Sequence, residues 1–171
     1  MNSKGFTLIE LLAVITIMGI LLLVAIPAIS RTIENSRRDA FVDVTKTYIN
    51  TVRSAVLANE LKCGTDNIDV AAVEDDTYYF VIDSTLQDTK DLMESGGLSP
   101  WSNAPVKGYV KWVKSGTSST YYAILADSGR HGLNAEIEEK SLNRSAIITR
   151  TGKYTNTIYK HPTTGTACTL K

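Results

Sequence analysis

The chain has 171 residues with 18 basic and 18 acidic side chains, so its formal net charge is zero. This balance argues against nucleic acid as an obligate partner, because proteins that bind nucleic acid usually present a strongly basic face. Without its apolar N-terminal segment the chain keeps roughly 140 residues, which suffice for one small domain with its own core.

The first predicted element is an apolar segment from Leu11 to Ile29, interrupted only by Thr16, Gly19 and Pro27. A helix of this length would measure about 28 Å, close to the bilayer core of about 30 Å. The segment is longer than the apolar region of a secretory signal peptide, and no cleavage site of small residues follows it. On hydropathy alone, the segment is a membrane anchor.

Glu10 places a carboxylate at the start of this apolar segment. At membrane depth a carboxylate costs about 2.5–3.5 kcal/mol on insertion scales, so a simple anchor would do better with an apolar residue there. A positive charge is the natural partner, but the segment contains none, and Lys4 lies in the short stretch before it. The partner therefore comes from another chain or is created by processing.

A known signal begins at Lys4, where the residues read KGFTLIELL and resemble the signal of type IV prepilins. The resemblance implies that a prepilin peptidase cleaves between Gly5 and Phe6 and that the new amino group of Phe6 is methylated. It also implies that Glu10 pairs with this amino group on a neighbouring subunit of a filament. Among apolar helices a paired carboxylate is tolerated and an unpaired one is penalised, which favours the correct axial register.

Gly19 and Pro27 lie inside the apolar segment, and both residues weaken a helix. Gly costs about 1 kcal/mol and Pro about 3 kcal/mol in a helix interior. By resemblance to the filaments of similar pilins, we expect the helix between Gly19 and Pro27 to lose its order in an assembled filament. The alternative is an ordinary kink, which is common in membrane helices because neighbours satisfy the exposed backbone groups.

The chain after the apolar segment continues as a helix, so one helix is predicted from about residue 6 to about residue 62. Apolar and aromatic residues recur at helical spacing in its second half and predict a face that covers a sheet. Gly64 is the expected C-cap. The residues of this face are Ile33, Ala40, Phe41, Val44, Tyr48, Val52, Ala55 and Val56.

The strand signals come later in the chain. Residues Thr77–Ile82 are rich in aromatic and β-branched side chains, and Gly108–Lys114 and Thr120–Asp127 flank the turn sequence SGTSS of a β-hairpin. A helix followed by mostly antiparallel strands predicts an α+β fold, with the long helix packed on an antiparallel sheet. Further candidates are strands at 145–151 and 154–160 and a short helix at 85–97.

Two cysteines, Cys63 and Cys168, could form one disulfide in an oxidising compartment, and the alternative is two free thiols. The bond would tie the end of the long helix to the C-terminus. In the chain-entropy model, closing a loop of about a hundred residues contributes up to roughly 4–5 kcal/mol. Many pilins instead bracket a C-terminal loop with their cysteine pair, so Cys63 departs from that layout.

Three groups of residues that could carry chemistry have plainer interpretations. Residues Asp127–His131 place an acid, a serine and a histidine together, but catalytic triads are assembled from distant segments, so we expect a solvated turn. The acids from Asp66 to Asp76 lack the spacing of an EF-hand loop, so no metal site is expected. The alternating aromatics and cations of Tyr109–Lys114 predict a strand with core on one face and solvent on the other.

The resemblance divides the chain into a leader at residues 1–5, a membrane and filament-core segment at 6–30, and a globular headgroup at 31–171. It implies a structural subunit of a type IV pilus, not an enzyme, in a filament that serves adhesion, aggregation or twitching motility. Size and plain composition favour a major pilin, similar in style to Gram-positive, clostridial pilins. No cofactor is expected.

The implied partners are copies of the chain in a homopolymeric helical filament, the prepilin peptidase and the inner-membrane assembly platform. The subunit would cross the cell membrane once before assembly and lie in a filament at the cell surface afterwards. One alternative is a pseudopilin of a type II secretion or DNA-uptake machine. Another is a membrane-anchored binding module, such as an adhesin or DNA receptor, which would have no need of Glu10.

Overall fold

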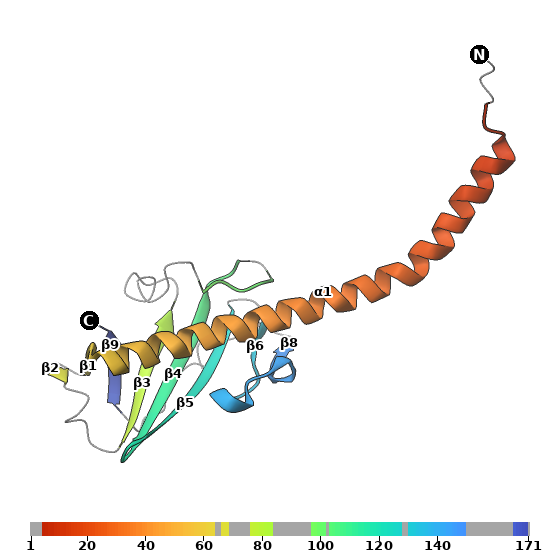
Figure 1. Ribbon diagram of the computed structural model, residues 1–171. Helices are drawn as coiled ribbons and strands as arrows, with labels where there is room; N and C mark the ends of the chain where they lie inside the picture. Colours follow the sequence, from red (N-terminus) through yellow and green to blue (C-terminus); the bar gives the residue numbers. More distant parts are fainter. Residues whose placement is uncertain are drawn as a thin grey trace. The chain divides into compact units, whose positions relative to one another are not determined.

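The computed structural model describes residues 5–63, 66–68, 76–83, 97–101, 103–127, 130–149 and 166–170. These residues form one long helix and a mainly antiparallel sheet (Figure 1). The predicted α+β fold is therefore confirmed. The chain divides into two units, Met1–Ser36 and Arg37–Lys171.

The helix α1 runs from Leu8 to Ala58 and continues through Pro27. In the first unit its large apolar side chains are exposed, from Leu8 at 84% to Ile33 at 48%. By length and composition, α1 is the one helix among the described residues that could cross a membrane. The first unit therefore presents an apolar surface that it cannot bury by itself.

The C-terminal end of α1 differs from the prediction. Asn59 has φ 59°, its N–H donates to Val56 O at 3.3 Å, and the N–H of Glu60 donates to Ala55 O at 2.9 Å. These two bonds form a Schellman motif, in which a left-handed residue satisfies the last carbonyl groups of a helix. The expectations of a helix to residue 62 and of a cap at Gly64 were wrong, because asparagine takes the left-handed position several residues earlier.

The second unit contains the sheet, whose strand order is β2-β1-β9-β3-β4-β5-β6-β8, with β7 beside β5. The described strand pairs are antiparallel except for β3 and β9, which are parallel. Two 3-10 helices, η2 (Glu139–Ser141) and η3 (Arg144–Ala146), follow β7. The strands are β1 Leu61–Cys63, β2 Asp66–Ile68, β3 Thr77–Asp83, β4 Val106–Ser115, β5 Ser118–Asp127, β6 His131–Leu133, β7 Ile137–Glu138, β8 Ile147–Thr149 and β9 Thr166–Leu170.

The predicted strand at 77–82, the hairpin and part of the strand at 145–151 are confirmed as β3, β4 with β5, and β8. The hairpin closes on Gly116, whose φ of 58° suits glycine, between paired residues Ser115 and Ser118. The strands β1, β2, β6, β7 and β9 were not predicted, because each has only two to five residues. The candidate strand at 154–160 lies outside the described residues, as does the candidate helix at 85–97 except for Gly97.

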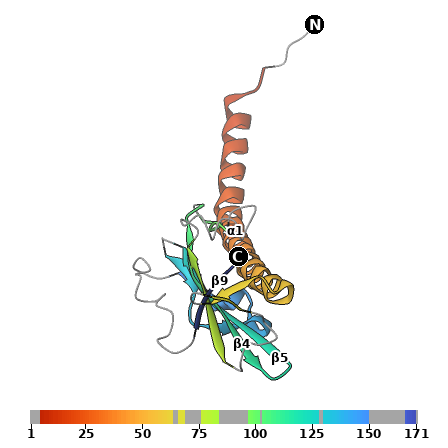
Figure 2. The ribbon, with the colours of Figure 1, turned by 90° about the vertical axis from the view of Figure 1, so that its left-hand side faces the viewer.

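The core lies between the second half of α1 and one face of the sheet, as Figures 1 and 2 show. Alternate residues of the central strands point to this face, and Phe80, Val110 and Ala123 are register partners that are all buried. The helical stripe is confirmed at Phe41, Tyr48, Val52, Ala55 and Val56, whereas Ile33 is exposed.

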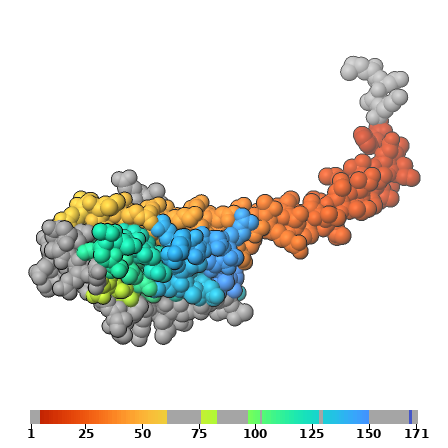
Figure 3. Space-filling view, turned by 60° about the horizontal axis from the view of Figure 1, so that its bottom comes forward, coloured from red at the N-terminus to blue at the C-terminus, as the bar shows by residue number. Residues whose placement is uncertain are grey.

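The segment from η3 to β8 is fastened to α1 by charged groups. Arg144 donates from Nε to Asp39 Oδ1 at 2.8 Å and from Nη2 to Asp39 Oδ2 at 2.5 Å. Arg38 donates to the carbonyl of Ile147 at 3.2 Å. In the space-filling view the blue surface of this segment lies directly against the orange surface of α1 (Figure 3). These bonds attach the segment from η3 to β8 to the part of α1 that belongs to the second unit.

Candidate assembly site at the N-terminus

The start of α1 is organised by Thr7 and Glu10. The Thr7 backbone N–H donates to Glu10 Oε2 at 2.8 Å, and the Thr7 hydroxyl donates to the same oxygen at 2.7 Å. In return the Glu10 N–H donates to Thr7 Oγ1 at 3.3 Å. This is a capping box, in which two side chains at the ends of the first turn satisfy backbone N–H groups that lack helical partners.

Thr7 was not among the predicted site residues, although the pattern T-x-x-E from Thr7 to Glu10 is the usual signal of a capping box. In the single subunit, Glu10 is therefore held by its own chain. The bonds from Thr7 bring hydrogen-bond donors but no positive charge. They also leave the second oxygen of Glu10 without a bond from any described residue. The carboxylate is oriented, and it can still accept a bond from a cation.

The residues of the predicted processing and assembly site, Gly5, Phe6 and Glu10, lie together at this end of α1. Gly5, Phe6 and Thr7 precede the first helical residue, and Phe6 is 83% exposed. Glu10 lies in the first turn of the helix and is also exposed. The peptide bond between Gly5 and Phe6 is thus outside the helix, where a protease could bind it in an extended form.

Gly19 and Pro27 lie within α1, which remains helical at both positions. Apart from the chain neighbours of Gly19 and the adjacent helix backbone, no atom lies within 4 Å of the position that a Cβ on Gly19 would take. In the single subunit, therefore, neither residue ends the helix. Their expected effect concerns a filament and stays a prediction.

The two cysteines come from the strands β1 and β9, which pair antiparallel with Cys63 opposite Cys168. Cys168 is 4% exposed and is disulfide-bonded. Because the chain has two cysteines, we propose Cys63 as the partner of Cys168. The register could not be foreseen, since neither strand was predicted.

Asp127 and His131 do not lie in a solvated turn, so that expectation was wrong. Asp127 is 2% exposed and accepts hydrogen bonds from the Ser99 hydroxyl at 2.9 Å and from the backbone N–H of His131 at 3.0 Å. The His131 ring stacks on Trp101 with centroids 4.1 Å apart. Ser99 bonds to the acid and not to the histidine, so the group fastens a loop and does not form a catalytic triad. Ser128 lies outside the described residues.

The second face of the sheet is also buried at several positions, which corrects the expectation that it meets solvent. Tyr109 is 6% exposed and donates to Glu136 Oε2 at 2.8 Å, while Lys111 forms an ion pair with Glu136. Burial and this bond raise the pKa of Tyr109. Trp112 is 1% exposed and belongs to the helix-facing core. The rings of Tyr109 and Trp112 are buried, so neither ring can stack on a base of a single-stranded nucleic acid.

Among the described residues no group of three or more His, Cys, Asp or Glu side chains could hold a metal ion. Of the acids considered for such a site, Asp66 lies in β2 and Asp76 accepts a bond from the N–H of Thr77 at 2.7 Å. Asp69 and Asp75 lie outside the described residues.

Comparison with known proteins points to the N-terminus. Residues 1–26 match the family model described as the prokaryotic N-terminal methylation motif. No curated protein and no solved structure matches the chain. The matched residues include Gly5, Phe6 and Glu10 together with most of the apolar segment, from Leu11 to Ile26. The chain therefore carries the N-terminal signal of a type IV pilin-like prepilin.

Proposed function

We propose that this protein is the structural subunit of a type IV pilus, a helical filament held together by the N-terminal helices. Glu10 is the observation that carries the proposal. Its carboxylate is oriented by Thr7, keeps one oxygen for another donor, and stands at the start of an exposed apolar helix. An α-amino group at Phe6 of a neighbouring copy would supply the missing positive charge.

In this proposal a prepilin peptidase cleaves between Gly5 and Phe6, and Phe6 is then methylated. The apolar part of the helix, residues 6–30, anchors the subunit in the cell membrane and later lies in the filament core. There the pairing of Glu10 with Phe6 compensates a carboxylate that would otherwise be penalised in an apolar environment. Subunits out of register would bury the carboxylate unpaired, so the pair selects one axial offset.

The headgroup, residues 31–171, would form the outer surface of the filament, and the assembly platform of the membrane would add the subunits. The filament would then serve adhesion, aggregation or twitching motility. A pseudopilin of a secretion or DNA-uptake machine would carry the same N-terminal signal. It differs in how far the filament grows out of the cell, which the following experiment measures.

The test compares Glu10→Ala and Glu10→Gln with the unchanged protein in its native host. We expect both variants to be cleaved and to remain in the membrane, and we expect assembly into sheared surface filaments to fall by at least about tenfold. A tenfold loss corresponds to about 1.4 kcal/mol. Both variants remove the carboxylate and leave the Phe6 amino group of the neighbouring copy unpaired among apolar helices, which costs more than this. The measurement is the amount of the protein in the sheared fraction, relative to the membrane fraction.

Intact mass of the unchanged protein provides the second readout. A chain that begins at Phe6 and is one methyl group heavier supports the processing step. A processed chain that stays in the membrane would favour a pseudopilin. A chain that still begins at Met1 would contradict the proposal and leave a simple membrane anchor. The control for the Glu10 variants in the assembly test is Lys46→Ala, which removes an exposed charge from the second half of α1.

A further inference from the structure

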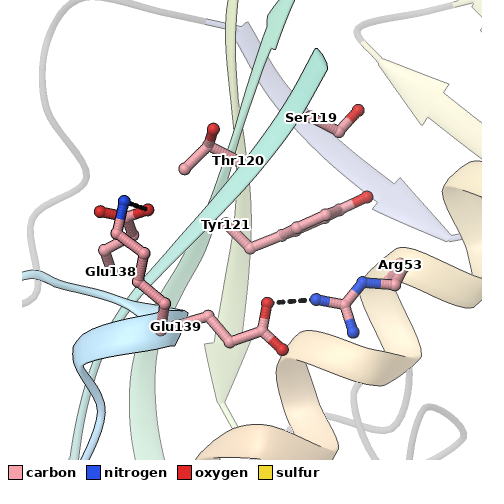
Figure 4. A pocket seen from close by; sticks show the side chains of 7 residues that line it. Arg53, Ser119, Thr120, Tyr121, Glu138 and Glu139 are labelled. Carbon is pink, nitrogen blue, oxygen red and sulfur yellow. Dashed lines mark hydrogen bonds and ion pairs between the residues drawn. The ribbon is translucent and has the colours of Figure 1, made fainter. Parts of the chain in front are cut away.

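A small hollow lies in the second unit where α1, β5 and the segment from β7 to η2 meet. Its volume is about 180 Å³, and Figure 4 shows the side chains that line it. Pockets for drug-sized ligands usually measure about 300–1,000 Å³. This hollow therefore admits one small ring or one terminal group of a longer molecule.

The hollow exists because β7 is short. Only Tyr122 and Ala123 of β5 pair with β7, after which the chain turns away into η2. The first part of β5, from Ser118 to Tyr121, pairs with β4 on one side and has no described strand on the other. Because the chain turns into η2 after β7, a gap remains beside the edge of β5 from Ser118 to Tyr121.

The walls of the hollow carry two ion pairs. Arg53 of α1 pairs with Glu139, and Lys140 pairs with Glu138 at 2.6 Å. The Arg53 guanidinium also lies 4.8 Å from the centroid of the Tyr121 ring. Figure 4 shows the Tyr121 ring between Ser119 and the pair of Arg53 with Glu139. The two cations and two anions sum to zero.

The walls are also fixed in place. The Trp112 indole N–H donates to the Ser119 hydroxyl at 3.0 Å, and Tyr121 is 6% exposed. Burial raises the pKa of Tyr121, so its phenol stays neutral. The Ser119 hydroxyl and the Tyr121 ring are thus held in set positions, which reduces the entropy that would be lost on ordering them around a ligand.

The charge pattern decides which ligand fits. An anion would have to displace Glu139 from Arg53 and would then meet two uncompensated carboxylates. A cation would have to displace Arg53 and would leave a guanidinium without its partner. A hydroxyl group can accept from the cation and donate to the carboxylate at the same time, so it enters an ion pair without leaving either charge alone.

We propose that this hollow binds one ring of a neutral, hydroxyl-rich saccharide. The inference rests on the proposed function, because it gives a surface filament a class of receptor. A hollow of this size makes few hydrogen bonds, so a single site would bind weakly, with a dissociation constant of about 1 mM. A filament that repeats the site would reach useful avidity, since linked sites gain about 10²–10⁴ over one site.

The test uses the full chain as a monomer in a zwitterionic detergent, because an alkyl glycoside detergent could itself occupy the hollow. Saturation-transfer NMR measures binding of the methyl glycosides of glucose, galactose and mannose, with sialic acid and inorganic phosphate as anionic probes. We expect at least one neutral glycoside to bind, and both anions to bind more weakly.

Two variants locate the binding. Thr120→Val changes a residue that lines the hollow, removes its hydroxyl and keeps the β-branched shape, so we expect glycoside affinity to fall about fivefold, the worth of one hydrogen bond. Glu138→Gln removes one acceptor and leaves the hollow positive, so glycoside binding should weaken and phosphate binding should appear. Thr149→Val makes the same change at an exposed position in β8, outside the hollow, and should bind as the unchanged protein does.

The proposal is overturned if no neutral glycoside binds, if Thr120→Val binds as well as the unchanged protein, or if either anion binds more tightly than every glycoside. Because the protein is monomeric in this experiment, Glu10→Ala should bind the glycoside normally. Failure of filament assembly and failure of saccharide binding are thus observed separately.

Discussion

Single residues decide how closely the central strands approach each other. Gly108 of β4 has φ 145°, and a Cβ there would lie 1.9 Å from the carbonyl oxygen of Ile124 in β5. Gly116, in the hairpin, also has a positive φ, but apart from its two chain neighbours no atom lies within 4 Å of the position that a Cβ would take. A side chain at Gly108 would therefore cause both backbone strain and a steric collision, whereas a side chain at Gly116 would cause only backbone strain. Comparing the two positions distinguishes these two effects.

We predict that Gly108→Ala lowers the free energy of unfolding by more than about 3 kcal/mol, because backbone atoms of β5 cannot move aside without breaking the sheet. Gly116→Ala should cost only about 1 kcal/mol, the strain of a left-handed residue. Urea unfolding of the full chain in detergent, followed by tryptophan fluorescence, measures both. Equal losses in the two variants would contradict this account of Gly108.

At the scale of elements, α1 has two parts with different surroundings. From Phe41 to Val56 it buries one face in the core of the second unit, which fixes that part as a helix. From Leu8 to Ile29 its side chains are exposed, so the helix there depends on its own hydrogen bonds. The hydroxyls of Thr16 and Ser30 bond to carbonyl groups one turn earlier, and Pro27 provides no N–H. The part from Leu8 to Ile29 is therefore the part whose helical structure can change.

We predict that residues between Gly19 and Pro27 lose helical order in the filament, where contacts with neighbouring subunits can replace the hydrogen bonds of the helix. Gly19→Ala with Pro27→Ala should restore about 4 kcal/mol of helix propensity and keep this segment helical. Electron cryo-microscopy of filaments from the two proteins compares the segment directly. An unbroken helical ladder in the unchanged filament would contradict the prediction.

At the scale of the whole molecule, β9 is the strand that joins the sheet's edge to its centre. It lies between β1, which follows α1, and β3, with which it pairs in parallel. Nothing in the local sequence directs β9 to this place, and its pairings join residues about a hundred positions apart in the chain. A disulfide from Cys168 to Cys63 would hold this arrangement, because it shortens the loop that folding must close.

We predict that Cys63→Ser with Cys168→Ser lowers the free energy of unfolding by up to about 4–5 kcal/mol, the chain-entropy value for this loop. Reduction of the unchanged protein should lower it by a similar amount. The intact mass of the unchanged protein should be two hydrogens below that of the reduced chain. Two titratable thiols in the unreduced, unfolded protein would show that the bond is absent.

Local patterns in the chain are enough to predict the long helix, its apolar and amphipathic parts, the hairpin of β4 and β5, and the N-terminal signal around Gly5, Phe6 and Glu10. These features depend on neighbours in the chain, whether through helical spacing, alternation or a short motif. The capping box of Thr7 with Glu10 belongs to the same class, since its pattern is local.

The remaining features depend on contacts between residues far apart in the chain. The short strands β1, β6, β7 and β9 have too few residues to show a period, and they form because the sheet offers them partners. The burial of Asp127 and Tyr109 depends on Ser99 and Glu136, which lie 28 and 27 positions away in the chain. A local pattern cannot specify such contacts, since their free energy is gained only when the fold brings distant residues together.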